Sequence, residues 1–171
     1  MPFRRPPKNR DYFTVDEVAA VADLPSKDMV TYLERTGVFS STYTTKTGEP
    51  WRRKGSWRRY TFRDIILLRV ISRLLASGVQ VSKLKKAMNH LREAHPEIAC
   101  ENRMAKYLVT DGEKVYFRNE SHQLETLGSG QYAFAFVIEF SVLHQSAVSK
   151  LTPEQIAVDR RFRRQTAGLS G

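Results

Sequence analysis

The sequence predicts an α+β fold, in which a helical N-terminal region is followed by a small module that contains β-strands. Three observations predict it. Residues 11–95 hold four segments with apolar residues at helical spacing, bounded by capping residues, Gly or Pro. A Thr-, Tyr- and Arg-rich stretch, residues 40–60, separates the second segment from the third and favours a two-stranded hairpin. After Pro96 the apolar period changes from helical to two.

The first two predicted helices form a helix-turn-helix. Thr14-Val-Asp-Glu17 matches a capping box, in which the Thr14 hydroxyl accepts from a backbone N–H and the Glu17 carboxylate reaches back. The helix that it begins runs to about Ala22. Asp23-Leu24-Pro25 interrupts it, Ser26 is a good N-cap for a second helix, and Gly37 ends that helix. Two short helices about three residues apart are typical of a helix-turn-helix.

Residues 40–60 are predicted to form a wing. Lys46-Thr-Gly-Glu49 is a turn sequence. The ten residues from Trp51 to Tyr60, WRRKGSWRRY, place five cations, two tryptophans and a tyrosine around a single glycine. Cations attract phosphate, and the rings can pack a hairpin or lie along a sugar–phosphate backbone. This segment therefore predicts contact with nucleic acid.

Two further helices follow the predicted wing. Thr61-Phe-Arg-Asp64 resembles a capping box, and the helix after it is apolar almost all round, which predicts the central core helix. Gly78 ends it, and Ser82 is expected to cap the next helix, which Pro96 stops. The apolar stripe of that last helix consists of Leu84, Ala87, Met88 and Leu91.

The second half of the chain has β-like patterns. Two β-favouring runs in residues 107–117 flank an Asp-Gly turn, which predicts a hairpin. A face of four residues with period two, Phe134, Phe136, Ile138 and Phe140, favours a strand, although the same segment could be a turn of buried helix. Residues 151–171 are expected to be a basic tail with a short helix at its start, and residues 1–10 a flexible basic arm.

Charge and composition narrow the classes of function. The net charge is +10 over 171 residues, and the excess of cations lies in residues 1–95. A cationic face on one module is typical of nucleic-acid binding. No apolar run is long enough to span a membrane, and residues 1–10 have no apolar core of a secretory signal. The single cysteine, Cys100, excludes an internal disulfide and fits a reducing cytoplasm.

The order of these elements resembles the N-terminal domain of the MerR family of transcription regulators. Three blocks carry the resemblance over residues 12–92: FTVDEVAAVADL, YLERTGV and WRRYTFRDIILLRVISRLLASGVQVSKLKKAM. The third block is the most specific, because a basic-aromatic wing, a cap, a core helix, a Gly and a capped helix fall in register together.

The resemblance implies a winged helix-turn-helix that binds double-stranded DNA as a homodimer. The helix that begins at Ser26 would enter the major groove, with Ser26, Lys27 and Thr31 facing bases or phosphates and Tyr32 bonding a phosphate. Arg58 and Tyr60 occupy wing positions that contact the backbone in that family. The full set of expected DNA-binding residues is Ser26, Lys27, Thr31, Tyr32, Arg52, Arg53, Lys54, Trp57, Arg58, Arg59 and Tyr60.

The role of residues 96–150 has two interpretations. The family's familiar members dimerise through a long helix, which Pro96 truncates here. The Phe134/Phe136/Ile138/Phe140 face could pair protomers, or residues 97–145 could form an effector or protein-partner site. Two other functions therefore stay open beside transcription regulation: an architectural DNA-bending factor such as an excisionase, and a DNA-binding antitoxin with a protein-binding C-terminal half.

Catalytic and metal chemistry are not expected. His90, His95 and Cys100 are five residues apart, so they would not share a helix face, and Pro96 intervenes. No phosphate-binding Gly-rich loop, nucleophile motif or close pair of acids is present in the sequence. We therefore expect no enzyme activity, no metal and no cofactor. The arginines near each end of the chain favour solvated tails over arms that enter a DNA groove.

Overall fold

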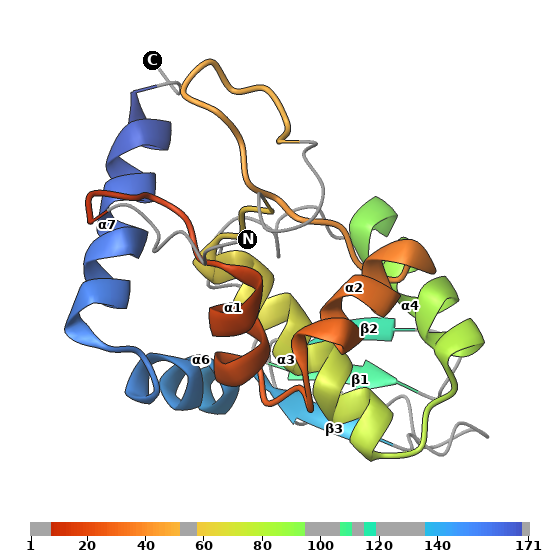
Figure 1. The fold of residues 1–171 in the computed structure, drawn as a ribbon. Helices are drawn as coiled ribbons and strands as arrows, with labels where there is room; N and C mark the ends of the chain where they lie inside the picture. The colour runs from red at the N-terminus through yellow and green to blue at the C-terminus, as the bar shows by residue number, and fades with distance from the viewer. Residues whose placement is uncertain (1–7, 52–57, 95–106, 111–114, 119–135, 169–171) are drawn as a thin grey trace.

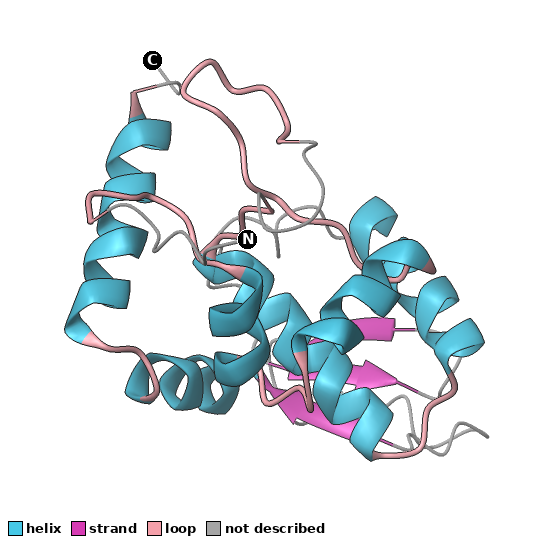
Figure 2. Ribbon diagram, viewed as in Figure 1, coloured by secondary structure: helices cyan, strands magenta, loops and turns pink. Residues whose placement is uncertain are grey.

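The computed structural model describes residues 8–51, 58–94, 107–110, 115–118 and 136–168. Helix α3 lies at the centre, in contact with α1, α4 and α6, while α1 also packs on α2 (Figure 1). Helices make up most of the described chain, and a small sheet lies beside α4 (Figure 2). The elements are α1 Val15–Val21, α2 Lys27–Arg35, α3 Phe62–Ala76, α4 Val81–Ala94, β1 Tyr107–Thr110, β2 Val115–Arg118, β3 Phe136–Glu139, α6 Phe140–Ser149 and α7 Pro153–Ala167.

Two helices start where the capping boxes predict. Thr14 caps α1, with its hydroxyl accepting from the Glu17 N–H and the Glu17 carboxylate accepting from the Thr14 N–H. Thr61 and Asp64 exchange the same two bonds at the start of α3. These predictions are confirmed because a capping box depends on residues only three apart and forms without help from the rest of the fold.

The ends of α2 and α3 are also as predicted, but the start of α4 is not. Gly37 and Gly78 follow these two helices with φ of +77° and +88°, in the left-handed region that favours glycine. The prediction that Ser82 caps α4 is wrong, because α4 begins at Val81. The Leu84 N–H donates to the Gln80 carbonyl at 2.9 Å, which puts Ser82 inside the first turn.

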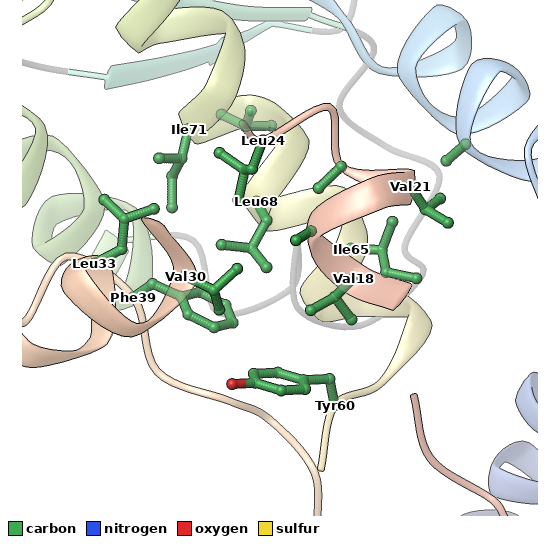
Figure 3. Packing of buried hydrophobic residues seen from close by; sticks show 14 of the residues in the cluster. Val18, Val21, Leu24, Val30, Leu33, Phe39, Tyr60, Ile65, Leu68 and Ile71 are labelled. Atoms are coloured by element: carbon green, nitrogen blue, oxygen red, sulfur yellow. The ribbon is translucent and has the colours of Figure 1, made fainter. Parts of the chain in front are cut away.

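A single apolar cluster joins the first four helices. Val18 of α1, Val30 and Leu33 of α2, and Ile65 and Leu68 of α3 all have 0% exposure. Their side chains converge from three elements, and the Tyr60 ring lies at the edge of the group (Figure 3). Burying one such side chain stabilises the fold by roughly 1.5–3 kcal/mol. Leu84 and Met88 of α4 join the same cluster. The core therefore holds α2 at a set angle to α1 and α3.

Helix α3 carries two buried charged side chains, Asp64 and Arg69. Asp64 accepts from the Thr42 N–H at 2.9 Å and from the Ser41 hydroxyl at 3.0 Å, so it ties the chain after α2 to the start of α3. Burial raises the pKa of Asp64 despite these bonds. Arg69 on α3 donates to the Val21 carbonyl at 2.5 Å and to Ser146 of α6 at 2.6 Å.

The chain over residues 43–51 doubles back as an irregular hairpin rather than as two strands. The Trp51 N–H donates to the Tyr43 carbonyl at 3.1 Å, and the Thr45 N–H donates to Glu49 at 2.8 Å. Gly48 turns the chain with φ of +82°. Of the described part of residues 40–60, only Thr44, Pro50 and Tyr60 form β-bridges, and those are isolated. Pro50 has no N–H to donate, which limits a regular ladder. We call residues 43–51 the 43–51 hairpin.

The described strands form one antiparallel sheet in the order β2-β1-β3. The predicted hairpin is confirmed, with Tyr107 opposite Arg118 and Thr110 opposite Val115. β3 adds to the other edge of β1, but it stops at Glu139 and α6 begins at Phe140. The prediction that the strand extends to Phe140 is wrong because the chain takes helical spacing there, with Leu143 and Ala147 buried one turn apart. The described strands are short, with four residues each. They are too few to establish a β-containing C-terminal module, which remains a prediction.

The ends of the described chain are more ordered than predicted. The expected basic tail contains α7, a 15-residue helix with a Thr152–Gln155 capping box. Arg10, which falls in the predicted flexible arm, is 6% exposed and binds Glu17 through two bonds of 2.5 Å. Both corrections have one cause. The last helix folds back on α1 and the segment before it, and sequence patterns do not show such long-range packing.

Candidate nucleic-acid interface

Helix α2 presents a polar face to solvent. Val30 and Leu33 are buried against the core, whereas Ser26, Lys27 and Tyr32 are exposed, as expected for a helix that meets a ligand. Ser26 sits at the N-cap but makes no side-chain cap hydrogen bond. The only ion pair seen for Lys27 among the described residues is a loose contact of 3.9 Å with Asp16. The N-terminal turn of α2 is therefore accessible, and it presents Lys27 together with the acid Asp28.

A four-residue cluster joins α2 to the chain that precedes α3. Arg58 Nη1 donates to the Thr31 hydroxyl at 2.8 Å and lies 3.1 Å from a Glu34 carboxylate oxygen. The Tyr60 hydroxyl donates to the other Glu34 oxygen at 2.9 Å. Thr31 and Glu34 are on one face of α2, and Arg58 and Tyr60 lie at the C-terminal end of the predicted wing. The cluster therefore sets the position of the wing's C-terminal end on α2.

Burial raises the pKa values of two groups in this cluster, Glu34 and Tyr60. Burial raises the pKa of Glu34, and the bond from Tyr60 and the charge of Arg58 offset this only in part. Burial also raises the pKa of Tyr60 strongly, and the Glu34 carboxylate raises it further. Tyr60 is 0% exposed and keeps its proton as a donor. The prediction that Tyr60 contacts a ligand directly does not fit this burial, since its hydroxyl is engaged inside the protein.

Arg59 lies among three aromatic rings. Its guanidinium carbon is 3.9 Å from the Trp51 ring centroid, 4.4 Å from that of Tyr12 and 5.5 Å from that of Tyr43. It also donates to the Tyr43 hydroxyl at 3.2 Å, and that hydroxyl donates to Asp11 at 3.0 Å. Cation–π contacts of this kind orient a guanidinium without neutralising its charge. Arg59 therefore braces the base of the 43–51 hairpin.

Several predicted residues lie outside what the structure describes. They are Arg52, Arg53, Lys54 and Trp57 of the wing, and Phe134 of the proposed interface face. The backbone of Phe136, Ile138 and Phe140 is described, in β3 and at the start of α6, but their side chains are not. Of the predicted DNA-binding residues, the structure brings together Thr31, Arg58 and Tyr60, which come from two separate segments.

Sequence patterns missed Glu34, Tyr12 and Tyr43. Each acts through a residue far along the chain, with Glu34 meeting Tyr60 and Tyr12 meeting Arg59. The one signal in the sequence for Glu34 was its spacing of three residues from Thr31, which puts both on one face of a helix. Among the described residues, no group of three or more His, Cys, Asp or Glu side chains could hold a metal ion. No described helix is both long and apolar enough to cross a membrane.

Comparison with known proteins agrees with this architecture. Residues 13–91 match the family model of the MerR HTH family regulatory proteins. The chain is also similar to uncharacterized HTH-type transcriptional regulators of Mycobacterium bovis and of two strains of Mycobacterium tuberculosis. In each case 29% of 85 aligned residues are identical, over 49% of this chain and 36% of the relative. The matched part thus spans about a third of the length of these relatives.

The matched residues coincide with the geometry described above. They begin at Phe13, just before the Thr14 cap, and end within α4. They include α1, α2, the 43–51 hairpin, the Arg58–Tyr60 segment and α3, all of which contribute to the core or to the cluster around Glu34. Residues 13–91 therefore match the model of the MerR HTH family regulatory proteins over the helix-turn-helix region.

Proposed function

We propose that this protein is a DNA-binding transcription regulator, with α2 as its recognition helix and residues 40–60 as its wing. The observation that carries the proposal is the Arg58–Thr31–Glu34–Tyr60 cluster, which holds the wing's end against α2. A reader of duplex DNA needs this rigidity, because phosphate contacts must place the recognition helix in register with the bases. The MerR family match over residues 13–91 and the relatives named as transcriptional regulators support the same function.

The exposed turn of α2 would meet the major groove. Its backbone N–H groups and the positive end of its dipole favour a phosphate oxygen, and Ser26 and Lys27 flank that position. Tyr32, one turn further along, is 37% exposed and can donate to a second phosphate. Thr31 is half-buried and is bonded to Arg58, so it acts by positioning Arg58 rather than by reading a base.

The wing would contact the DNA backbone on the other side of the recognition helix. Arg58 keeps four of its five N–H donors for groups other than Thr31, and a phosphate could compete with Glu34 for them. Arg52, Arg53 and Lys54 would add to this contact as the cations between the 43–51 hairpin and Arg58. Arg59 and Trp57 complete the predicted set. Arg59 lies over the Trp51 ring and so stabilises the 43–51 hairpin.

The assembly is a separate proposal. We expect a homodimer on a two-fold operator, paired through the face of Phe134, Phe136, Ile138 and Phe140, or a protein partner bound through residues 97–145. Because the ring of Pro96 excludes helical geometry at the residue before it, we expect pairing without a long continuation of α4. Phe136→Asp should convert a dimer into monomers in analytical ultracentrifugation, and an unchanged mass would contradict this mode of pairing.

The function is tested by selecting genomic DNA fragments that the purified protein protects, followed by a salt titration on the best sequence. We expect a repeated two-fold motif beside promoters and a steep fall in affinity with salt. Arg58→Ala should weaken binding to all sequences alike and lower the salt slope by about one. Arg73→Ala is the matched control, since Arg73 is an exposed cation in the last turn of α3.

The outcomes separate the competing functions. If the Arg58 and Arg73 variants lose equal affinity for DNA, Arg58 contributes only through the net charge of the protein and not through a contact of the wing. Protected sites that cluster at recombination junctions would favour an architectural DNA-bending factor. Co-purification of one small protein that blocks DNA binding would favour the antitoxin. Absence of any sequence preference and of any salt dependence would exclude a DNA-binding regulator.

A further inference from the structure

The last helix, α7, lies against the DNA-binding region and not apart from it. Val158 on α7 is 0% exposed, and Gln155 donates to the Glu17 carboxylate of α1 at 3.2 Å. Arg161 donates to the carbonyls of Lys8 and Arg10 at 3.2 Å and 3.0 Å. These contacts join residues more than 130 positions apart in the chain. α7 is therefore fixed to α1 and to the segment that precedes it.

The C-terminal end of α7 reaches the 43–51 hairpin. The Phe162 ring centroid is 5.4 Å from that of Tyr43, at the base of the hairpin. Further along α7, Gln165 lines a pocket of about 320 Å³ together with Thr45, Lys46, Thr47, Trp51 and Arg59. In Figure 1 the upper end of α7 approaches the same loop. The helix thus runs from α1 to the turn of the proposed wing.

The opposite face of α7 is cationic. A helix turns by about 100° per residue, so Arg160, Arg163 and Arg164 fall on one side and Arg161, Phe162 and Gln165 on the packed side. The first three are exposed. Arg163 pairs with Asp159 at 2.8 Å. Within the described part of the chain no ion pair is seen for Arg160 or Arg164, which are one turn apart. Like charges at this spacing are unfavourable in an isolated helix.

We propose that α7 is an additional phosphate-binding element, with Arg160 and Arg164 contacting the DNA backbone beyond the wing. The proposal rests on the function proposed above. A polyanion would relieve the repulsion between these two arginines, and Gln165, the residue after Arg164 on α7, lines the pocket together with Lys46 of the 43–51 hairpin. A DNA strand that follows the wing past Lys46 would reach the end of α7 that carries Arg164, one turn after Arg160. The footprint of each subunit is then longer than the one that the helix-turn-helix region accounts for.

The experiment compares three full-length proteins on the DNA selected above: wild type, R160Q/R164Q and R160K/R164K. Binding is measured by fluorescence anisotropy across a salt series, and contacts are mapped by hydroxyl-radical footprinting. Loss of two phosphate contacts should lower the slope of log affinity against log salt by about two, equally for specific and non-specific DNA. The lysine variant retains the charge and should keep the slope. Both arginines are exposed, so circular dichroism should show unchanged folding.

The footprint gives a second readout. The glutamine variant should lose protection only at the flank next to the wing, while protection by α2 and Arg58 remains. If the wild type binds DNA and R160Q/R164Q shows the same salt slope, the proposed role of α7 is overturned and the proposed function stays intact. Wild-type protein that binds no DNA would overturn both. An equal loss of slope in R160K/R164K would also overturn the proposal, because charge would not explain it.

Discussion

The Tyr60 hydroxyl donates a 2.9 Å hydrogen bond to Glu34, which joins the chain before α3 to the exposed helix α2. Tyr60 is fully buried, and burial raises the pKa of Glu34. Arg58 reaches the second oxygen of the same carboxylate at 3.1 Å. One half-buried acid thus holds two residues of the wing segment. Its bonds set the angle between wing and helix, on which any reading of DNA by this fold depends.

Tyr60→Phe should destabilise the protein by about 1–2 kcal/mol, because it removes a donor from the half-buried Glu34 carboxylate. The pKa of Glu34 should rise further, so the loss should be greatest above that pKa and shrink when acid protonates Glu34. Urea unfolding at several pH values measures both effects. Tyr32→Phe is the control, since Tyr32 is exposed. Equal effects of the two variants would mean that the Tyr60–Glu34 bond adds nothing.

Glu17→Gln should cost about 3 kcal/mol at neutral pH, because it breaks a buried pair with Arg10. Burial alone would raise the pKa of Glu17, but bonds from Arg10, Thr14 and Gln155 together bring it below its ordinary value of 4.5. A carboxylate whose pKa is lower in the folded protein stabilises the fold at pH values above its pKa in the unfolded chain. This stabilisation is lost as the pH falls through the pKa in the folded protein.

The difference between wild type and Glu17→Gln should therefore be full above about pH 4.5 and shrink below it. Thermal unfolding over a pH series checks this. Asp16→Asn is the matched control, as Asp16 is its exposed neighbour with only a 3.9 Å contact to Lys27. A difference that stays constant down to pH 2 would show that Glu17 acts by packing and not by charge.

Arg69→Met should destabilise the fold by about 3 kcal/mol, because Arg69 is buried and links three segments. It binds the Val21 carbonyl, the Asp23 carboxylate at 3.1 Å and Ser146 of α6. Methionine fills much of the same volume and forms none of these bonds. Guanidinium unfolding gives the loss, and limited proteolysis should show faster cleavage near α6.

Arg73→Met tests whether this effect belongs to the buried site. Arg73 is one turn further along α3 and is exposed, so its replacement should change stability by no more than about 0.5 kcal/mol. Similar losses for the two variants would assign the effect to net charge and remove the link between α3 and α6.

Gly37→Ala should cost about 1–2 kcal/mol, since φ of +77° is a conformation that a Cβ atom disfavours. The added methyl would also lie 3.4 Å from the Lys85 side chain, which can move aside, so the backbone is the main cause. Gly168→Ala is the control, because Gly168 caps α7 in a right-handed conformation with φ of −71°. Urea unfolding should show a loss only for Gly37→Ala. Equal stability of both variants would contradict the strain at Gly37.

The sequence by itself determined the local part of this protein. The starts of α1 and α3 follow from Thr14 with Glu17 and from Thr61 with Asp64, whose bonds span three residues. The end of α2 follows from Gly37, and the β1–β2 hairpin follows from a turn within the same short segment. These features need only neighbouring residues, so their patterns could be recognised, and together they carried the resemblance to the MerR family.

The tertiary structure decided which distant residues meet. Glu17 bonds Gln155 across most of the chain, and this contact turns an expected tail into a docked helix. Arg59 lies among rings from two separate segments, and Tyr60 is buried because Glu34 offers its hydroxyl a partner. Such contacts depend on how the core orients whole helices, and no pattern along the chain contains that information. The candidate site was therefore predictable in its position but not in the partners that hold its residues.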